Sequence, residues 1–177
     1  MTLKEAYEYG QKRLMDAGID DAVIDAWYLL EHVTGISRAI YFLRMNEEMN
    51  EQSEVQYKEY LDTRANHIPL QHITGVQEFM GLEFNVNEHV LVPRQDTEVL
   101  VEEALKVLKP EMKVLDMCTG SGCIIISLMK FAKAISGTAV DISEEALKVA
   151  KNIKNIKNFY DSYVSYVFNI KKIETQV

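Results

Sequence analysis

The hydrophobic positions in the first part of the chain recur at helical spacing. Thr2 precedes the first run and Glu5 follows three residues later, which is the pattern of an N-terminal capping box. One face of the predicted helix carries Leu3, Ala6, Tyr7, Gly10, Leu14 and Ala17. Gly18 is positioned to end it, and a second helical run ends in the same way at Gly35. Shorter helical patterns continue to residue 67, so we predict an N-terminal helical bundle over residues 1–74.

The hydrophobic period changes after Pro69. Leu82, Phe84 and Val86 alternate with polar residues, and a second short apolar run at 90–92 follows a polar turn. This alternation is typical of strands, because successive side chains of a strand point to opposite faces. We therefore predict a β-hairpin linker over residues 75–93, with residues 82–86 and 90–92 as its strands.

From residue 94 onward, helical and strand patterns alternate. A helix after Pro93, with acidic residues in its first turn, is followed by a strand, a glycine loop, a helix, the strand GTAVDI and another helix. Such alternation predicts a parallel α/β sheet, and Val164 to Ile170 could form a third strand. The predicted fold class is α/β, with residues 94–177 forming the first part of a Rossmann-like sheet.

The stretch VLDMCTGSGCIIISL, residues 114–128, predicts a nucleotide-type site. A strand that leads into Gly120 and Gly122 allows the backbone to approach a ligand, and amide groups at a helix N-terminus are available to it. A dinucleotide fingerprint would have a third glycine where this chain has Ile125. Asp116 and Asp141 lie at matching strand ends, and Asp141 is positioned for ribose hydroxyls. S-adenosylmethionine fits this pattern best, and a tight turn without a ligand is the alternative.

Composition and charge narrow the function classes. The formal net charge of -8 argues against a dominant attraction to nucleic acid, and neither a membrane-spanning run nor a signal peptide is evident. We expect a cytoplasmic protein without direct nucleic-acid or membrane partners. The four histidines have no metal-ligand spacing, so we assign no metal site. Cys118 and Cys123 are expected to be free, buried thiols, and Trp27 and the tyrosines of the first two helices to pack the bundle core.

Four blocks of sequence together resemble the PrmC/HemK family of release-factor glutamine methyltransferases. They are LQHITGVQEFMGLEFNV, VLVPRQDTEVLVEEAL, VLDMCTGSGCIIISL and AVDISEEALKVAKNI, in the order that the family has them. The resemblance implies a helical substrate-recognition domain, a hairpin linker and a methyltransferase domain. The implied activity is methylation of the glutamine amide in the Gly-Gly-Gln motif of peptide chain release factors. The cofactor would be S-adenosylmethionine. The candidate cofactor-binding residues are Asp116, Cys118, Thr119, Gly120, Ser121, Gly122 and Asp141.

The chain departs from the family pattern in two places. Residues 93–98 read PRQDTE, which keeps Arg94, Thr97 and Glu98 but lacks the second proline of the family block. The family's catalytic Asn-Pro-Pro-Tyr is missing, because no proline follows Pro110. In the family, this motif accepts the two hydrogens of the substrate amide. We therefore assign no catalytic residue, and we interpret the chain as truncated or frameshifted and catalytically impaired.

Two other functions remain open at this point. The chain could be a non-enzymatic remnant that binds release factors through its helical domain or binds only the cofactor. A nucleic-acid adenine methyltransferase is a third possibility, because such enzymes share the same catalytic motif. It has less support from the acidic charge balance and the N-terminal blocks.

Overall fold

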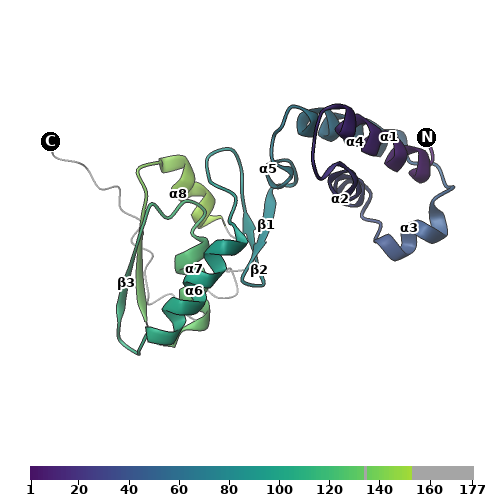
Figure 1. The fold of residues 1–177 in the computed structure, drawn as a ribbon. Helices are drawn as coiled ribbons and strands as arrows, with labels where there is room; N and C mark the ends of the chain where they lie inside the picture. The colour runs from purple at the N-terminus through teal and green to yellow at the C-terminus, as the bar shows by residue number, and fades with distance from the viewer. Residues whose placement is uncertain (134, 153–177) are drawn as a thin grey trace. The chain divides into compact units, whose positions relative to one another are not determined.

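The computed structural model describes residues 1–133 and 135–152, and they fall into two compact units, Met1–Thr74 and Gly75–Val177 (Figure 1). The first unit consists of α1 (Leu3–Asp16), α2 (Ala22–Thr34), α3 (Arg38–Arg44), α4 (Glu51–Ala65) and α5 (Leu70–Thr74). The second contains β1 (Val76–Phe79), β2 (Leu82–Asn85), α6 (Gln95–Val107), β3 (Lys113–Met117), α7 (Cys123–Phe131), β4 (Ser136–Val140) and α8 (Glu144–Lys151). The predicted order of helices, hairpin and parallel α/β elements is confirmed.

The ends of the first two helices follow from local hydrogen bonding. The Thr2 N–H donates to Glu5 Oε2 at 2.8 Å, and the Glu5 N–H donates to Thr2 Oγ1 at 3.2 Å. The predicted capping box is therefore confirmed, and it satisfies two N–H groups that have no partner within the helix. Gly35 ends α2 in the left-handed region at φ 67°, where a side chain would be strained.

The core of the N-terminal unit forms where α1, α2 and α4 pack together. Tyr57 of α4 is completely buried, and its hydroxyl donates to the Ala26 carbonyl oxygen at 3.0 Å. Helix α1 can approach Tyr57 only at Gly10, because a Cβ there would lie 2.0 Å from the tyrosine oxygen. The buried residues around this contact are Leu3, Ala6, Leu14, Ile19, Ala22, Trp27, Leu29, Leu30, Tyr41 and Leu61.

The aromatic residues of the first two helices divide between core and surface. Trp27 is buried, and Tyr7 packs edge-on against it with ring centroids 5.8 Å apart. Tyr9 and Tyr28 are exposed, so the prediction that the tyrosines of these helices pack the core is wrong for these two. Their positions fall outside the face of α1 or α2 that meets the bundle.

The hairpin lies earlier in the chain than the alternation of hydrophobic and polar residues predicted. Val76–Phe79 pairs antiparallel with Leu82–Asn85, and residues 90–92 form no strand. The reason is the two-residue turn at Met80 and Gly81, where both residues have positive φ, as a type I′ hairpin turn requires. Residues 87–90 form a separate turn, in which the Val90 N–H donates to the Asn87 carbonyl oxygen.

Several contacts join the hairpin to the rest of the second unit. Phe79 and Phe84 are buried in one cluster with Val101 of α6 and Ile125 of α7. The Met80 N–H in the hairpin turn also donates to Glu98 Oε1 at 2.6 Å. This bond gives Glu98, in the first turn of α6, a role in holding the hairpin against that helix.

The remaining strands, β3 and β4, pair in parallel, and α6 and α7 lie together on one face of this sheet (Figure 1). Ile125 and Leu128 of α7 and Ala139 of β4 are buried between the layers. Leu115 and Met117 of β3 are more than half exposed. This arrangement confirms the α/β fold class and the first part of a Rossmann-like sheet.

Two further expectations bear on the extent of the fold. The possible third strand at Val164 to Ile170 lies outside the described residues. Within residues 1–133 and 135–152, no helix has the length and apolar character needed to cross a membrane.

Candidate functional site

The candidate site lies where the carboxyl ends of β3 and β4 meet. Asp116 is in register with Ala139, and Met117 with Val140, so the strands end beside each other. The glycine loop, residues 118–122, follows β3, and Asp141 follows β4. Ligands of open parallel sheets bind at this edge, because the loops after neighbouring strands converge there.

Two glycines give the loop its path. Gly120 has φ 55°, and apart from the adjacent residues no heavy atom lies within 4 Å of the place where its Cβ would be. Gly122 has φ 79° and begins α7, and a Cβ there would lie 2.8 Å from Ile126 Cδ1. The left-handed backbone and the close neighbours thus favour glycine at position 122, whereas Gly120 leaves open space beside the backbone at the tip of the loop.

A glycine in β4 also allows a close approach to α7. Ile125 occupies the position where a dinucleotide fingerprint has its third glycine, which allows the helix to approach the sheet. Here Gly137 of β4 provides that space, because a Cβ on it would lie 2.8 Å from Ile125 Cδ1. The glycine needed for helix and strand packing is therefore on β4 instead of on α7.

Asp141 is held in place by two backbone amides. The Gly120 N–H donates to its Oδ2 at 2.9 Å, and the Ser143 N–H donates to its Oδ1 at 2.9 Å. Each carboxylate oxygen can accept more than one hydrogen bond, so both can still accept hydrogen bonds from a ligand. The bond to Gly120 joins the tip of the glycine loop to the end of β4, across 21 positions of sequence.

Asp116 faces the interior of the loop. Its Oδ2 accepts a hydrogen bond from Thr119 Oγ1 at 2.6 Å. Burial raises the pKa of the Asp116 carboxyl, and the Thr119 hydroxyl and the Ile125 backbone oppose the rise. The bond to Thr119 thus braces the loop against β3.

The two cysteines of the loop differ in environment. Both are free, but Cys118 is exposed, so the expectation that both thiols are buried is wrong for Cys118. Cys123 is buried, and burial raises the pKa of its thiol, although the nearby Ser121 side chain acts to lower it. A buried thiol with a raised pKa is a poor nucleophile, because the thiolate is the reactive form.

Cys118 occupies a backbone conformation that favours glycine, at φ 60°. The left-handed region costs a residue with a Cβ roughly 1–2 kcal/mol, and glycine avoids that cost but loses more backbone entropy on folding. We expect Cys118→Gly to raise the free energy of unfolding by about 0.5 to 1 kcal/mol. Urea unfolding measures the change, and Cys118→Ala is the matched control because it keeps the Cβ. An equal gain in both variants would show that the thiol, not the backbone, is responsible.

Two groups that were not predicted from the sequence complete the arrangement. Ser143 clamps Asp141 with its N–H and also caps α8, where its hydroxyl accepts from the Ala146 N–H at 3.1 Å. Serine before two glutamates at a helix start is a recognisable cap, and an aspartate two residues earlier is a typical partner for its N–H. The Val140 carbonyl, which accepts from the Thr119 N–H at 3.0 Å, carries no signal in the sequence.

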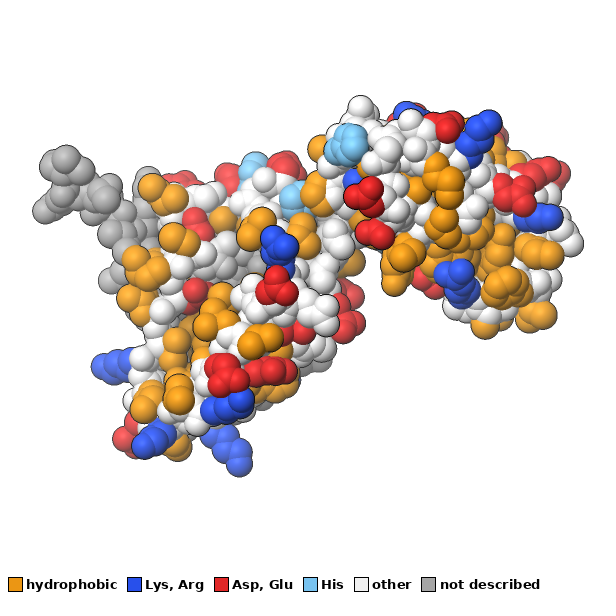
Figure 2. Space-filling view, in the orientation of Figure 1, with side chains coloured by type: hydrophobic (Ala, Val, Ile, Leu, Met, Phe, Trp, Pro, Cys, Tyr) orange, Lys and Arg blue, Asp and Glu red, His pale blue; other side chains and the backbone are white. Residues whose placement is uncertain are grey.

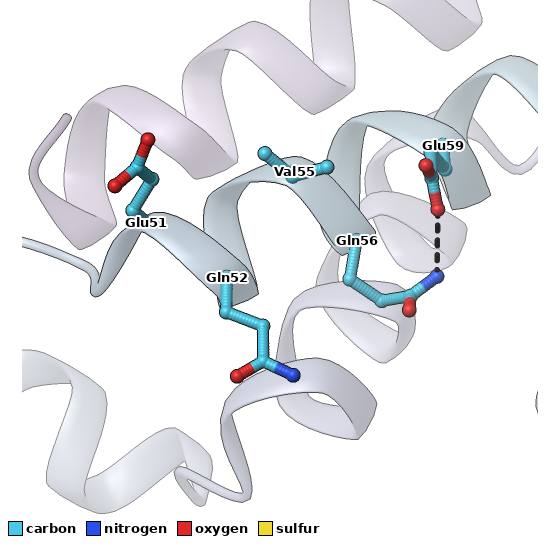
Figure 3. Close-up of a pocket in the computed structure, with 5 residues that line it drawn as sticks. All are labelled: Glu51, Gln52, Val55, Gln56 and Glu59. Carbon is cyan, nitrogen blue, oxygen red and sulfur yellow. Dashed lines mark hydrogen bonds between the residues drawn. The ribbon is translucent and has the colours of Figure 1, made fainter.

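Two hollows lie in the N-terminal unit. One runs along the exposed side of α4, where Gln56 Nε2 donates to Glu59 Oε2 at 3.2 Å (Figure 3). One face of a single helix lines it, and this face does not enclose a ligand. The other lies between α1, α2 and α3 beside Trp27, with the Arg38 guanidinium 5.2 Å from the Trp27 ring centroid.

Apolar side chains are exposed close to the second hollow. Figure 2 shows hydrophobic side chains gathered at the surface of the N-terminal unit, and Ile40, Phe42 and Leu43 of α3 are among those exposed. Exposed apolar clusters of this kind are found at protein interaction surfaces.

The described residues contain no group of three or more His, Cys, Asp or Glu side chains that could hold a metal ion.

Both parts of the chain are similar to known families. Residues 5–75 match the PrmC N-terminal domain, and residues 108–177 match a methyltransferase domain. A release factor glutamine methyltransferase of Caulobacter vibrioides is 37% identical over 153 residues, which are 85% of this chain and 53% of that protein. The protein of that name from Koribacter versatilis is 39% identical, with 85% of this chain and 55% of that protein covered. A bifunctional methyltransferase of Rickettsia typhi is 33% identical in an alignment over 172 residues. This alignment covers 85% of this chain and 33% of the Rickettsia protein.

These matches confirm the resemblance to the PrmC/HemK family. The chain spans about half the length of the first two of these relatives. The match to the PrmC N-terminal domain precedes the match to a methyltransferase domain, which is the order that the sequence blocks predicted.

Proposed function

We propose that this chain, a relative of the PrmC/HemK release-factor glutamine methyltransferases, binds S-adenosylmethionine at the edge formed by β3 and β4. The proposed cofactor-binding site is made up of Asp116, Cys118, Thr119, Gly120, Ser121, Gly122 and Asp141. The observation that carries the proposal is the hydrogen bond from the Gly120 N–H to Asp141 Oδ2, which joins the two elements such a cofactor would need.

The residues of this edge fit a nucleoside with free ribose hydroxyls. Both oxygens of Asp141 are oriented by backbone amides and can still accept, so the carboxylate can take up the two neighbouring hydroxyls of a ribose. The open side of Gly120 would let the ligand approach the main chain. A phosphate group beside Asp141 would be repelled by the carboxylate, which favours a cofactor without phosphate at this position.

The proposed family activity is transfer of a methyl group to the glutamine amide of the Gly-Gly-Gln motif in peptide chain release factors. S-adenosylmethionine supplies the methyl group, and the protein must hold the amide nitrogen in line with it. An amide nitrogen is a weak nucleophile, so this orientation accounts for much of the catalysis. The 177 residues contain no Asn-Pro-Pro-Tyr, and we propose that the chain binds the cofactor but transfers the methyl group poorly.

The helical unit is the proposed contact for release factors. Its match to the PrmC N-terminal domain supports this role, as do the exposed apolar residues of α3. We propose that residues 1–74 recognise the release factor, residues 75–93 form the hairpin linker, and residues 94–177 bind the cofactor. Release factors act in the cytoplasm, and we expect this chain to act there, without direct contact to nucleic acid.

The proposed function predicts binding without turnover. In equilibrium dialysis with methyl-labelled S-adenosylmethionine, the chain should retain label above a bovine albumin blank. When a purified release factor is added, transfer to it should stay far below that of a relative containing Asn-Pro-Pro-Tyr.

The two readouts separate the parts of the proposal. Absence of retained label would refute cofactor binding. Retention together with transfer at the rate of the relative would refute the impaired chemistry. Retention without transfer would support the whole proposal, and release of the label by unlabelled S-adenosylhomocysteine would show that binding is specific.

A further inference from the structure

Thr119 is the most constrained polar residue of the glycine loop. Its hydroxyl donates to Asp116 Oδ2 at 2.6 Å, and its N–H donates to the Val140 carbonyl oxygen at 3.0 Å. Its own carbonyl oxygen accepts from the Gly122 N–H at 2.8 Å. The residue is 7% exposed. Every polar group of Thr119 is therefore bonded within the protein.

Asp116, the partner of that hydroxyl, is fixed in turn. It lies on β3, in register with Ala139 of β4. A strand carboxylate that accepts a hydrogen bond from a loop hydroxyl joins the strand to the loop. Partial burial strengthens this bond, because water competes for it less effectively.

From these contacts we propose that Thr119 and Asp116 are positioning residues, which set the affinity of the cofactor site by holding Gly120 in its binding conformation without touching the ligand themselves. This inference rests on the proposed binding of S-adenosylmethionine. It assigns Asp116 and Thr119 a different role from that of Asp141, which faces the ligand.

The physical reason is the position of Gly120 between two anchors. Thr119 fixes the backbone on one side, and Asp141 holds the Gly120 N–H on the other. Glycine has more accessible backbone conformations than other residues, so a loop tip with one anchor removed populates more of them. Binding must then select the competent conformation, and the apparent dissociation constant rises by the inverse of its population.

The experiment measures binding of S-adenosylhomocysteine by calorimetry to the parent chain, Thr119→Val and Thr119→Ser. Valine has nearly the same shape but has no hydroxyl, whereas serine keeps it. We expect Thr119→Val to weaken binding about tenfold and Thr119→Ser by less than about threefold. Thr138→Val is the matched control, because it removes a hydroxyl from β4 without changing the loop, and its dissociation constant should equal that of the parent.

A cycle with Asp116→Asn separates positioning from a general loss of stability. The amide is a weaker acceptor than the carboxylate, so Thr119→Val should cost less in the Asp116→Asn chain than in the parent. Equal costs in the two backgrounds would overturn the inference. Urea unfolding is used to choose a temperature at which every variant is folded, and all binding is measured at that temperature. Thr119→Ala serves as a second variant that has no hydroxyl.

The outcomes distinguish the two levels of the proposal. If the parent does not bind S-adenosylhomocysteine, the proposed function fails, and this inference fails with it. If the parent binds and Thr119→Val binds equally well while unfolding more easily, the hydroxyl has only a structural role and the inference alone is overturned. Weaker binding by Thr119→Val, recovered in Thr119→Ser, would support it.

Discussion

Asp141→Ala should weaken binding of S-adenosylmethionine by about 100-fold or more. The carboxylate is the proposed acceptor for two ribose hydroxyls, and a hydrogen bond to a charged group contributes roughly 1.5–3 kcal/mol. Two such bonds correspond to about 3 kcal/mol at the lower limit, or two orders of magnitude in the dissociation constant. The substitution also releases the Gly120 N–H from its partner, which adds to the loss.

Calorimetry of the two chains measures this difference. Glu145→Gln is the matched control, because it removes a negative charge from the exposed first turn of α8, where Glu145 pairs with Lys148 at 2.6 Å. The control should bind like the parent, since exposed ion pairs contribute little and are screened by salt. Undiminished binding by Asp141→Ala would refute the assignment of Asp141 to the ribose. A comparable loss in Glu145→Gln would indicate a nonspecific charge effect.

Asp25→Ala should destabilise the N-terminal unit by about 3 to 5 kcal/mol. Asp25 is 6% exposed, and its Oδ2 lies 2.6 Å from Arg64 Nε, so the pair connects α2 to α4. Removal of the carboxylate leaves a guanidinium in a largely buried position without its counter-charge. The remaining bond from Arg64 Nη1 to the Ile68 carbonyl oxygen, at 3.2 Å, does not neutralise it.

Urea unfolding followed by tryptophan fluorescence measures this effect. Trp27 is the single tryptophan of the sequence and is buried in this unit, so its emission reports unfolding of the unit directly. Asp62→Ala removes an acidic residue from α4, the helix that also carries Arg64. Asp62 forms an exposed ion pair with Arg13 of α1, in which the nitrogen and oxygen lie 3.0 Å apart. That control should cost less than about 1 kcal/mol. Similar losses in the two variants would contradict the importance of burial.

Much of the local structure could be predicted because the signals lie within a few residues of each other. Thr2 and Glu5 form the expected capping box, and Gly35 ends α2 in the expected conformation. The hairpin was misplaced because alternation does not specify which strands pair. The pair of positive φ values at Met80 and Gly81 specifies it, and methionine carries little signal for such a turn.

In the candidate site, too, some features could be predicted from the sequence and others could not. Parallel strands of similar length bring their carboxyl ends together, so the proximity of the glycine loop and Asp141 could be predicted. The different orientation of Asp116 could not, because both aspartates follow the same strand pattern in the sequence. Cofactor contact by any of these residues stays a prediction that the binding experiments address.

The sequence by itself determined the helices, the order of the α/β elements, the glycine loop and the family resemblance. These depend on hydrophobic period, capping residues and short motifs, whose physical effects act over one or two turns of chain. Tertiary structure alone decided that Gly10 accommodates Tyr57, that Gly137 accommodates Ile125, and that Asp25 pairs with Arg64. Each of these contacts joins residues distant in sequence, and close packing of side chains selects them only after the elements have come together.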